Sequence, residues 1–60
     1  MARACVVLAE GFEEIEAVTV IDVLRRAEVE VELVAARSPQ VMGAHGLELY
    51  APMGIEEAIE

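Results

Sequence analysis

Three glutamates stand close together at positions 13, 14 and 16, directly after a glycine turn. A carboxyl group in such a place can hold or transfer a proton. An apolar segment, residues 4–9, precedes them, and Gly11 suits the turn because glycine tolerates backbone angles closed to other residues. We expect a helix to begin here, since its positive end favours negative charge. Glu13 and Glu14 are expected to be solvated, as acidic residues at helix starts usually are.

Glu16 is different, because it falls on the side of this helix that should be buried. At 3.6 residues per turn, the apolar residues gather on one face: Ala17, Val20, Ile21, Val23, Leu24 and Ala27. Glu16 shares this face, near the carboxyl edge of the strand, where open α/β sheets bind ligands. A buried carboxyl group needs a partner or stays protonated. Glu16 is therefore a functional candidate; the alternative is a structural role, bonded to nearby backbone amides.

The opposite side of the helix predicts contact with another chain. Ile15 and Val18 project there, and two exposed branched residues suggest a subunit or domain interface. Asp22 and Arg26 have the spacing of an i,i+4 ion pair, whose ordinary role is on a solvated face.

The remaining segments complete an α/β pattern. Residues 4–9 are continuously apolar, as in a parallel strand covered on both faces. Residues 29–36 predict a second strand, which a right-handed crossover places parallel to the first. Residues 41–51 predict a small antiparallel hairpin with a bend between Gly43 and Gly46. Residues 52–54 close this hairpin, and a helical segment follows at residues 55–60.

Composition excludes several classes of function. Twelve acidic and four basic residues give a net charge of −8, which argues against nucleic acid and anionic membranes as partners. There is no phosphate-binding or dinucleotide-binding glycine motif. Nothing has the length of a membrane span or the pattern of a signal peptide, so a cytoplasmic location is expected. With one cysteine and one histidine, neither a disulfide framework nor a metal site is expected. Cys5 is expected to be a buried structural thiol. His45 is expected to be a surface or hairpin histidine rather than a catalytic one, because no second ligand or base partner is visible near it.

The chain is short for the fold that it predicts. At 60 residues it buries only about 60% of its unfolded surface, and a single full helix cannot cover both faces of the first strand. We therefore expect residues 1–60 to be the first part of one larger α/β domain, with the remainder of that domain as a necessary partner.

Three segments in this order carry a family resemblance. They are Leu8-Ala9-Glu10-Gly11-Phe12-Glu13-Glu14-Ile15-Glu16-Ala17-Val18, then residues 21–27, then Gly43-Ala44-His45-Gly46-Leu47. Together they resemble the start of the ThiJ/PfpI superfamily, in particular its DJ-one and YajL-like branch. The resemblance covers essentially the whole chain, about the first third of such a domain. It implies a flavodoxin-like (Rossmannoid) α/β domain that begins with a βαβ unit and a small hairpin, needs no cofactor and forms homodimers.

The resemblance also implies roles for the pocket residues. In the family a reactive cysteine sits on a strand-to-helix elbow and is hydrogen-bonded by a glutamate from the first helix. Glu16 matches this glutamate, and Glu13 matches a second carboxylate near the mouth of the pocket. Gly11 matches the turn glycine, and Arg26 matches a position that approaches the partner subunit's pocket.

The other matched positions belong to subunit contacts. Ile15 and Val18 match the helix face used in the dimer, and Asp22 matches a position near the partner's pocket. Two features depart from the pattern. The elbow cysteine would lie beyond residue 60, and neither Cys5 nor His45 takes over a catalytic role. Met53 stands where the family often has aspartate.

The chemistry implied is attack by a thiolate on a reactive carbonyl such as a 2-oxoaldehyde, a glyoxalase-like or deglycase-like reaction. Peptide hydrolysis and oxidation sensing are alternatives within the family. A dimerising stress-response or chaperone-like module is an alternative from another class. A cysteine on a glycine-rich elbow downstream would favour the enzyme. The 60-residue chain alone is expected to be inactive.

Overall fold

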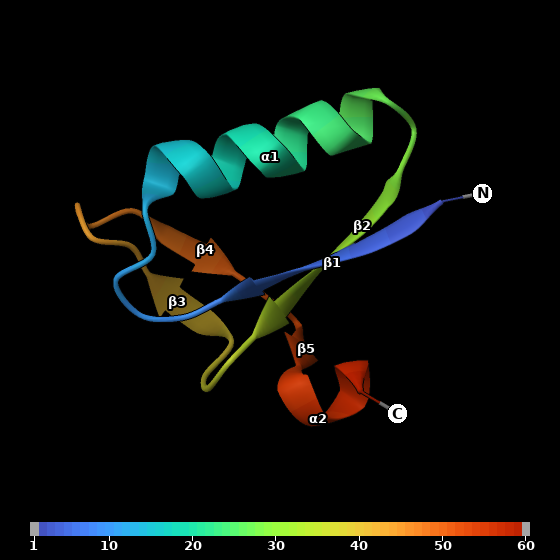
Figure 1. Cartoon of the computed structure of the whole chain (residues 1–60). Coiled ribbons are helices and arrows are strands. Elements are labelled where there is room, and N and C mark those ends of the chain that lie inside the picture. The colour runs from blue at the N-terminus through green and yellow to red at the C-terminus, as the bar shows by residue number, and fades with distance from the viewer. Residues whose placement is uncertain (1, 60) are drawn as a thin grey trace.

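The computed structural model describes residues 2–59 and shows an α/β arrangement (Figure 1). The elements follow in the order β1 (Arg3–Leu8), α1 (Glu14–Arg26), β2 (Glu30–Ala35), β3 (Gln40–Met42), β4 (Glu48–Tyr50), β5 (Met53–Gly54) and α2 (Ile55–Ala58). In Figure 1, α1 lies over one face of the sheet and the short α2 lies on the other side. No helix within residues 2–59 is long and apolar enough to cross a membrane.

The main sheet is parallel, with the strand order β1-β2-β5. Leu8 pairs with Ala35, and Ala35 pairs in turn with Gly54. The helix between β1 and β2 therefore makes the crossover that the sequence predicts. Strand β5 is an addition, because residues 52–54 were expected only to close the hairpin. Two residues are too few to show the alternation by which a strand is recognised.

The predicted hairpin is confirmed and forms a separate two-stranded sheet. Strands β3 and β4 are antiparallel, with Val41 opposite Leu49. Gly46 has a φ of +91°, a conformation that glycine adopts without strain. The core lies where this hairpin meets the α1 face of the main sheet. Its buried members are Leu8, Ala35, Val41 and Ala51.

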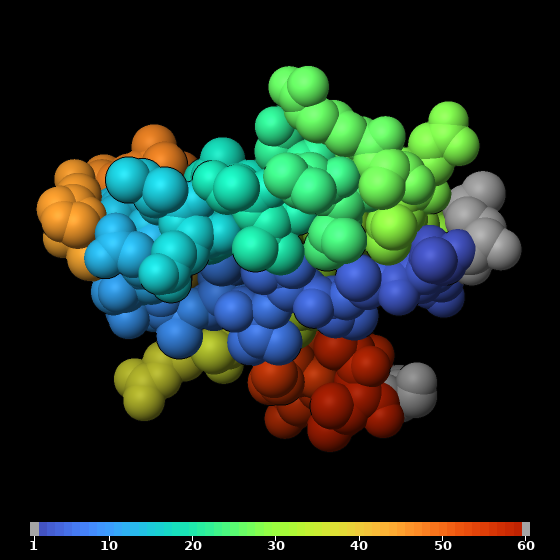
Figure 2. Space-filling view, turned by 45° about the horizontal axis from the view of Figure 1, so that its top comes forward, coloured from blue at the N-terminus to red at the C-terminus, as the bar shows by residue number. Residues whose placement is uncertain are grey.

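Within residues 2–59, β1 is covered on one face only, as we expected of a chain with a single full helix. Along β1 the side chains alternate, so that Val6 and Leu8 pack against the core while Cys5 and Val7 are exposed. The reason is that the short helix α2, on the face opposite α1, packs mainly against β2 and β5. Figure 2 shows β1 at the surface between α1 and α2. Cys5 is therefore an exposed thiol here and not the buried one that we expected.

Helix α1 packs through a narrower stripe than its apolar residues suggest. Ile21 is buried, and Ala17 and Leu24 are half-buried, whereas Val20 is 49% and Val23 is 57% exposed. These two valines belong to the same apolar face, but they are turned away from the sheet. The helix therefore has an uncovered apolar stripe beside the one that it buries.

Candidate functional site at the start of helix α1

The turn before α1 is fixed by backbone bonds to the hairpin. The Phe12 amide donates to the Ala9 carbonyl at 3.1 Å, and the Gly11 amide donates to the Met42 carbonyl at 2.8 Å. Gly11 has a φ of +86°, as its predicted role in a tight turn requires. The Ala44 amide then donates to the Phe12 carbonyl at 2.8 Å. These bonds place the β3–β4 loop, residues 43–47, directly against the first turn of α1.

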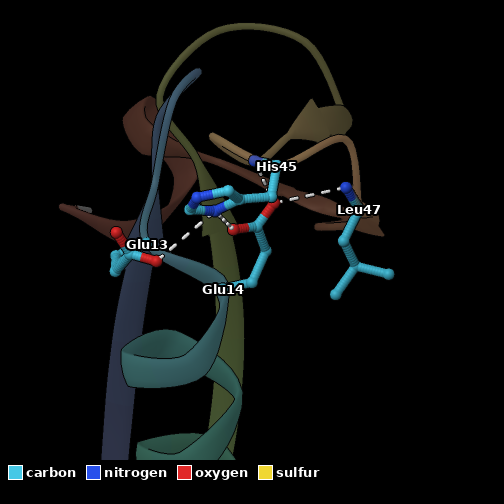
Figure 3. A network of polar contacts seen from close by, with 4 residues as sticks. All are labelled: Glu13, Glu14, His45 and Leu47. Carbon is cyan, nitrogen blue, oxygen red and sulfur yellow. Dashed lines mark hydrogen bonds and ion pairs between the residues drawn. The ribbon is translucent and has the colours of Figure 1, made fainter.

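Glu14 is the centre of the contact between these two segments (Figure 3). Only 8% of this residue is exposed. Its Oε2 accepts bonds from the backbone amides of His45 at 2.6 Å and Leu47 at 3.3 Å. Its Oε1 lies 2.8 Å from Nδ1 of the His45 ring. A Cβ atom on Gly43 would lie 2.5 Å from Glu14 Oε2, so the carboxylate fits only because residue 43 is glycine.

The electrostatics of the network favour a charged pair. Burial opposes ionisation of Glu14, but the bonds from the His45 ring and from backbone amides outweigh it and lower the pKa of Glu14 from 4.5 to about 2. The hydrogen bond to Glu14, together with the charges of Glu14 and Glu13, raises the pKa of His45 above 6.5. Glu13 takes part at longer range, with its Oε1 3.6 Å from His45 Nδ1.

One prediction about this network was wrong, because Glu14 was expected to be solvated and is buried. His45 is the exposed hairpin histidine that we expected, but it has a base partner, Glu14, that was not visible near it in the sequence. The signal for Glu14 lies in the helix spacing, because Glu14 precedes Ala17 by three positions and Ile21 by seven, which is the stripe that packs. His45 carries no such signal, since its partner is 31 residues away in sequence.

Glu13, Glu14 and His45 have the residue types of a cation site, but hydrogen bonds already occupy the Glu14 oxygens. One ligand atom from each of Glu13, Glu14 and His45 lies within 4.8 Å of the others. Backbone amides and the ring nitrogen already occupy both Glu14 oxygens. A cation would have to displace the bond between Glu14 and His45.

Glu16 is exposed, which corrects the expectation that it is at least partly buried. The helical projection assumed that the whole apolar face packs, whereas the packed stripe runs through Ala17 and Ile21 and leaves Glu16 outside it. Within residues 2–59 the Glu16 carboxylate makes no hydrogen bond or ion pair. The amide-binding role considered for Glu16 is filled by Glu14.

The structure keeps the other predicted site residues apart. Glu13 precedes α1 and Arg26 ends it, a separation of about 20 Å at the rise of an α-helix. Arg26 is bonded to Asp22 at 3.0 Å, the predicted i,i+4 pair. Ile15 is 78% and Val18 40% exposed, as the projection predicts.

Two surface hollows lie near this end of the sheet. One, of about 330 Å³, is lined by Glu13, Glu14, Ile15, His45 and Leu47. The other, of about 260 Å³, lies at the carboxyl ends of β1 and β2, the edge expected to bind ligands. Its lining is Leu8, Ala9, Glu10, Ala36, Arg37, Ser38 and Val41. Of the predicted site residues, Glu13 and Ile15 line a hollow, and Glu16 and Gly11 line neither of the two.

Comparison with known proteins gives one family. The sequence profile of the DJ-1/PfpI family matches residues 2–60. A search of the curated proteins found no match. Among solved structures, a point mutant of a DJ-1 superfamily protein from Salmonella typhimurium is 40% identical, with a TM-score of 0.89 over 95% of this chain. Oxidised DJ-1 from Toxoplasma gondii is 35% identical, with a TM-score of 0.90 over 93% of this chain. The VC2308 protein is 38% identical, with a TM-score of 0.88 over 93% of this chain.

The match covers only part of these structures. The chain spans 31% of the Salmonella protein, 31% of the Toxoplasma protein and 30% of VC2308. The similarity therefore concerns about one third of each of those proteins.

Proposed function

Because the chain belongs to the DJ-1/PfpI family, we propose that it is the amino-terminal segment of a cofactor-independent cysteine enzyme acting on reactive carbonyls. The reaction would be glyoxalase-like or deglycase-like, with Glu16 supporting a nucleophilic cysteine beyond residue 60. The observation that carries this proposal is the state of Glu16. Its carboxylate stands in the first turn of α1, exposed and unbonded within residues 2–59, and is thus available to a group from outside them.

The uncovered stripe of α1 supports the same proposal. Val20 and Val23 flank Glu16 on a helix face that the described residues leave open. Branched apolar residues gain stability when they are buried, so this stripe favours a further layer of the same domain packed against α1. Such a layer would bring its own side chains close to Glu16. We propose that residues 1–60 form part of one domain that this layer completes.

The proposed chemistry assigns Glu16 the handling of one proton. The thiolate adds to the aldehyde carbon of a 2-oxoaldehyde, and the carbonyl oxygen takes up a proton to give a hemithioacetal. Transfer of the C1 proton to C2 through an enediol gives the thioester of a 2-hydroxy acid. Water then hydrolyses this thioester and regenerates the thiol. A protonated Glu16 can hydrogen-bond to the thiolate beforehand and shuttle the proton during addition. A reducing cytoplasm suits such a thiol.

The test compares the protein that contains the complete domain with its Glu16→Gln variant, with methylglyoxal as substrate. Glutamine keeps the shape of the side chain but cannot transfer a proton, so we expect kcat/KM to fall by about 10²-fold to 10⁴-fold. The matched control is Glu56→Gln, which removes the same charge from an exposed position on α2. Its kcat/KM should stay within about twofold of the wild type.

The thiol itself is tested by a cysteine-reactive probe and an intact mass. One modified cysteine outside residues 1–60, with loss of turnover, supports the enzyme. Modification of Cys5 alone, with no turnover by the complete protein, would overturn it. The purified 60-residue chain should not turn over methylglyoxal in either case.

A dimerising module is a second candidate function, because apolar side chains are exposed on one side of α1. Ile15 and Val18 are exposed on one side of α1, with Asp22 on the same side. Exposed branched residues gathered on one side of a helix are typical of a protein interface. We propose a homodimer that uses this side of α1, in which Arg26 and Asp22 approach the pocket of the partner subunit. An enzyme and a stress-response or chaperone-like module would both use such a dimer, and only the enzyme needs the thiol.

A further inference from the structure

His45 contacts both carboxylates at the start of α1, but it holds them in different ways. The Glu14 carboxylate also accepts hydrogen bonds from the backbone amides of His45 and Leu47. These bonds keep it in place whether the His45 ring is charged or neutral. Glu13 lies 3.6 Å from the ring nitrogen, beyond hydrogen-bond range, with half of its side chain exposed. The backbone of Glu13 is held by the bond from the Ala17 amide, but within residues 2–59 the contact with the His45 ring is the one polar interaction of its carboxylate.

Among residues 2–59, His45 is the basic group within ion-pair distance of Glu13. Arg37 also lies at this end of the sheet, but it lines the other hollow, beside Glu10. The charged residues on the elements that meet here are acidic: Glu10 in the turn, Glu13, Glu14 and Glu16 at the start of α1, and Glu48 on β4. Glu10 is bonded to the Met42 amide. The basic residues of α1, Arg25 and Arg26, lie in its last turn.

We propose that His45 is a positioning residue for Glu13, and that through Glu13 it selects between neutral and anionic carbonyl substrates. Charged His45 holds the Glu13 carboxylate against the loop of residues 43–47 and offsets its charge. Neutral His45 releases Glu13 and leaves a free negative charge in the hollow lined by Glu13, Ile15 and Leu47. The part of this inference that concerns substrates rests on the proposed function, because it takes Glu13 to be at the mouth of the pocket.

The ring is well placed to titrate in this way. Its side chain is 74% exposed, so protons reach it from solvent without opening the fold. Its neighbours keep it charged to a higher pH than an isolated histidine. Release of Glu13 is thus expected at a higher pH than the one at which an isolated histidine loses its proton.

The structural half of the inference is tested by NMR on the protein that contains the complete domain, at about 15 °C, where small domains are near their maximum stability. The Glu13 carboxyl carbon and the His45 ring are followed from pH 5 to 9. We expect the Glu13 resonance to shift at the pH at which His45 titrates. In His45→Gln this shift should disappear. In His45→Arg, which keeps a positive charge, Glu13 should stay in its low-pH position throughout.

Two further variants separate positioning from a general effect on folding. Glu14→Gln removes the charge that stabilises protonated His45, so the His45 midpoint should fall toward 6.5 and the Glu13 shift should move with it. Glu10→Gln removes a neighbouring charge from the turn and should leave both unchanged. A Glu13 resonance that does not move with His45 in the wild type, or that moves in the same way in His45→Gln, overturns the inference.

The substrate half is tested on the protein with the complete domain, with methylglyoxal as the neutral substrate and 4,5-dioxopentanoate, a 2-oxoaldehyde that carries a remote carboxylate, as the anionic one. As the pH rises through the His45 titration, KM for 4,5-dioxopentanoate should increase by about threefold or more relative to methylglyoxal. In His45→Arg the ratio should stay constant. If the protein turns over both substrates and the ratio is the same in all variants, the selection by His45 is wrong. If it turns over neither while the Glu13 shift persists, the proposed function fails and the positioning of Glu13 stands.

Discussion

At the scale of single residues, Glu14 joins the helix start to the β3–β4 loop, and this link should depend on pH in two directions. The folded state lowers the pKa of Glu14 from 4.5 to about 2, so the contribution of Glu14 to stability is present above pH 4.5 and is lost as the pH falls toward 2. The folded state raises the pKa of His45 above 6.5. The contribution of His45 to stability is therefore present below pH 6.5 and is lost as the pH rises through the raised pKa.

We therefore expect the stabilising effect of this pair to be greatest between about pH 4.5 and 6.5. The measurement is the urea midpoint of the wild type minus that of Glu14→Gln, taken from pH 2 to 9. The subtraction removes the repulsion among the other acidic residues, which both proteins share. A difference that is constant over this range would contradict the ion pair.

Gly43 gives a second prediction at this scale. In Gly43→Ala the new Cβ would lie 2.5 Å from Glu14 Oε2, so the carboxylate must move and lose its bonds to the loop. We expect the Tm to fall by roughly 5 °C or more. Gly54→Ala is the matched control, because its Cβ would meet only Glu57 Oε1, at an ordinary 3.5 Å. Equal Tm values for the two variants, measured by circular dichroism, would show that Glu14 does not need the space at Gly43.

At the scale of elements, α1 carries two apolar stripes, and only one is used within the described residues. Ile21→Val removes a methyl group from the buried stripe and should lower the free energy of unfolding by about 1 kcal/mol. Val23→Ala shortens a side chain that is 57% exposed and should change it by less than about 0.5 kcal/mol. Urea unfolding of the 60-residue chain measures both.

In the protein with the complete domain, Val23→Ala should no longer be close to neutral for stability. If a further layer covers Val23, Val23→Ala should then become destabilising by about 1 kcal/mol or more. An unchanged stability there would mean that the second stripe of α1 stays open, and it would count against the proposed extra layer.

The helices and strands were largely predictable from the sequence. Which side of each element is buried was not. A continuous apolar run, a glycine turn and a helical period predict β1, α1 and β2, because these signals are local. Which part of an apolar face packs depends on what lies opposite, so the projection placed Glu16 inside and Glu14 outside. The pairing of His45 with Glu14 depends on the hairpin register, which brings together residues 31 positions apart. Local patterns contain no information of that kind.

At the scale of the whole molecule, the exposed side of α1 predicts self-association. Ile15, at 78% exposure, is the most exposed large apolar side chain of α1 and lies near Val18. In a two-fold symmetric dimer this patch would meet its own copy, so that each substitution acts twice. We expect the protein with the complete domain to be a dimer by light scattering at micromolar concentration.

Ile15→Asp should convert that dimer into a monomer, because it would bury two like charges in an apolar contact. Gln40→Asp is the matched control, since it adds the same charge at an exposed position on β3, away from α1. Its mass should remain that of the dimer. The pocket proposal connects to this result through Arg26, which lies too far along α1 to reach Glu13 of its own chain. If Ile15→Asp gives a folded monomer with full turnover of methylglyoxal, Arg26 has no role across the interface, and the catalytic site is complete within one subunit.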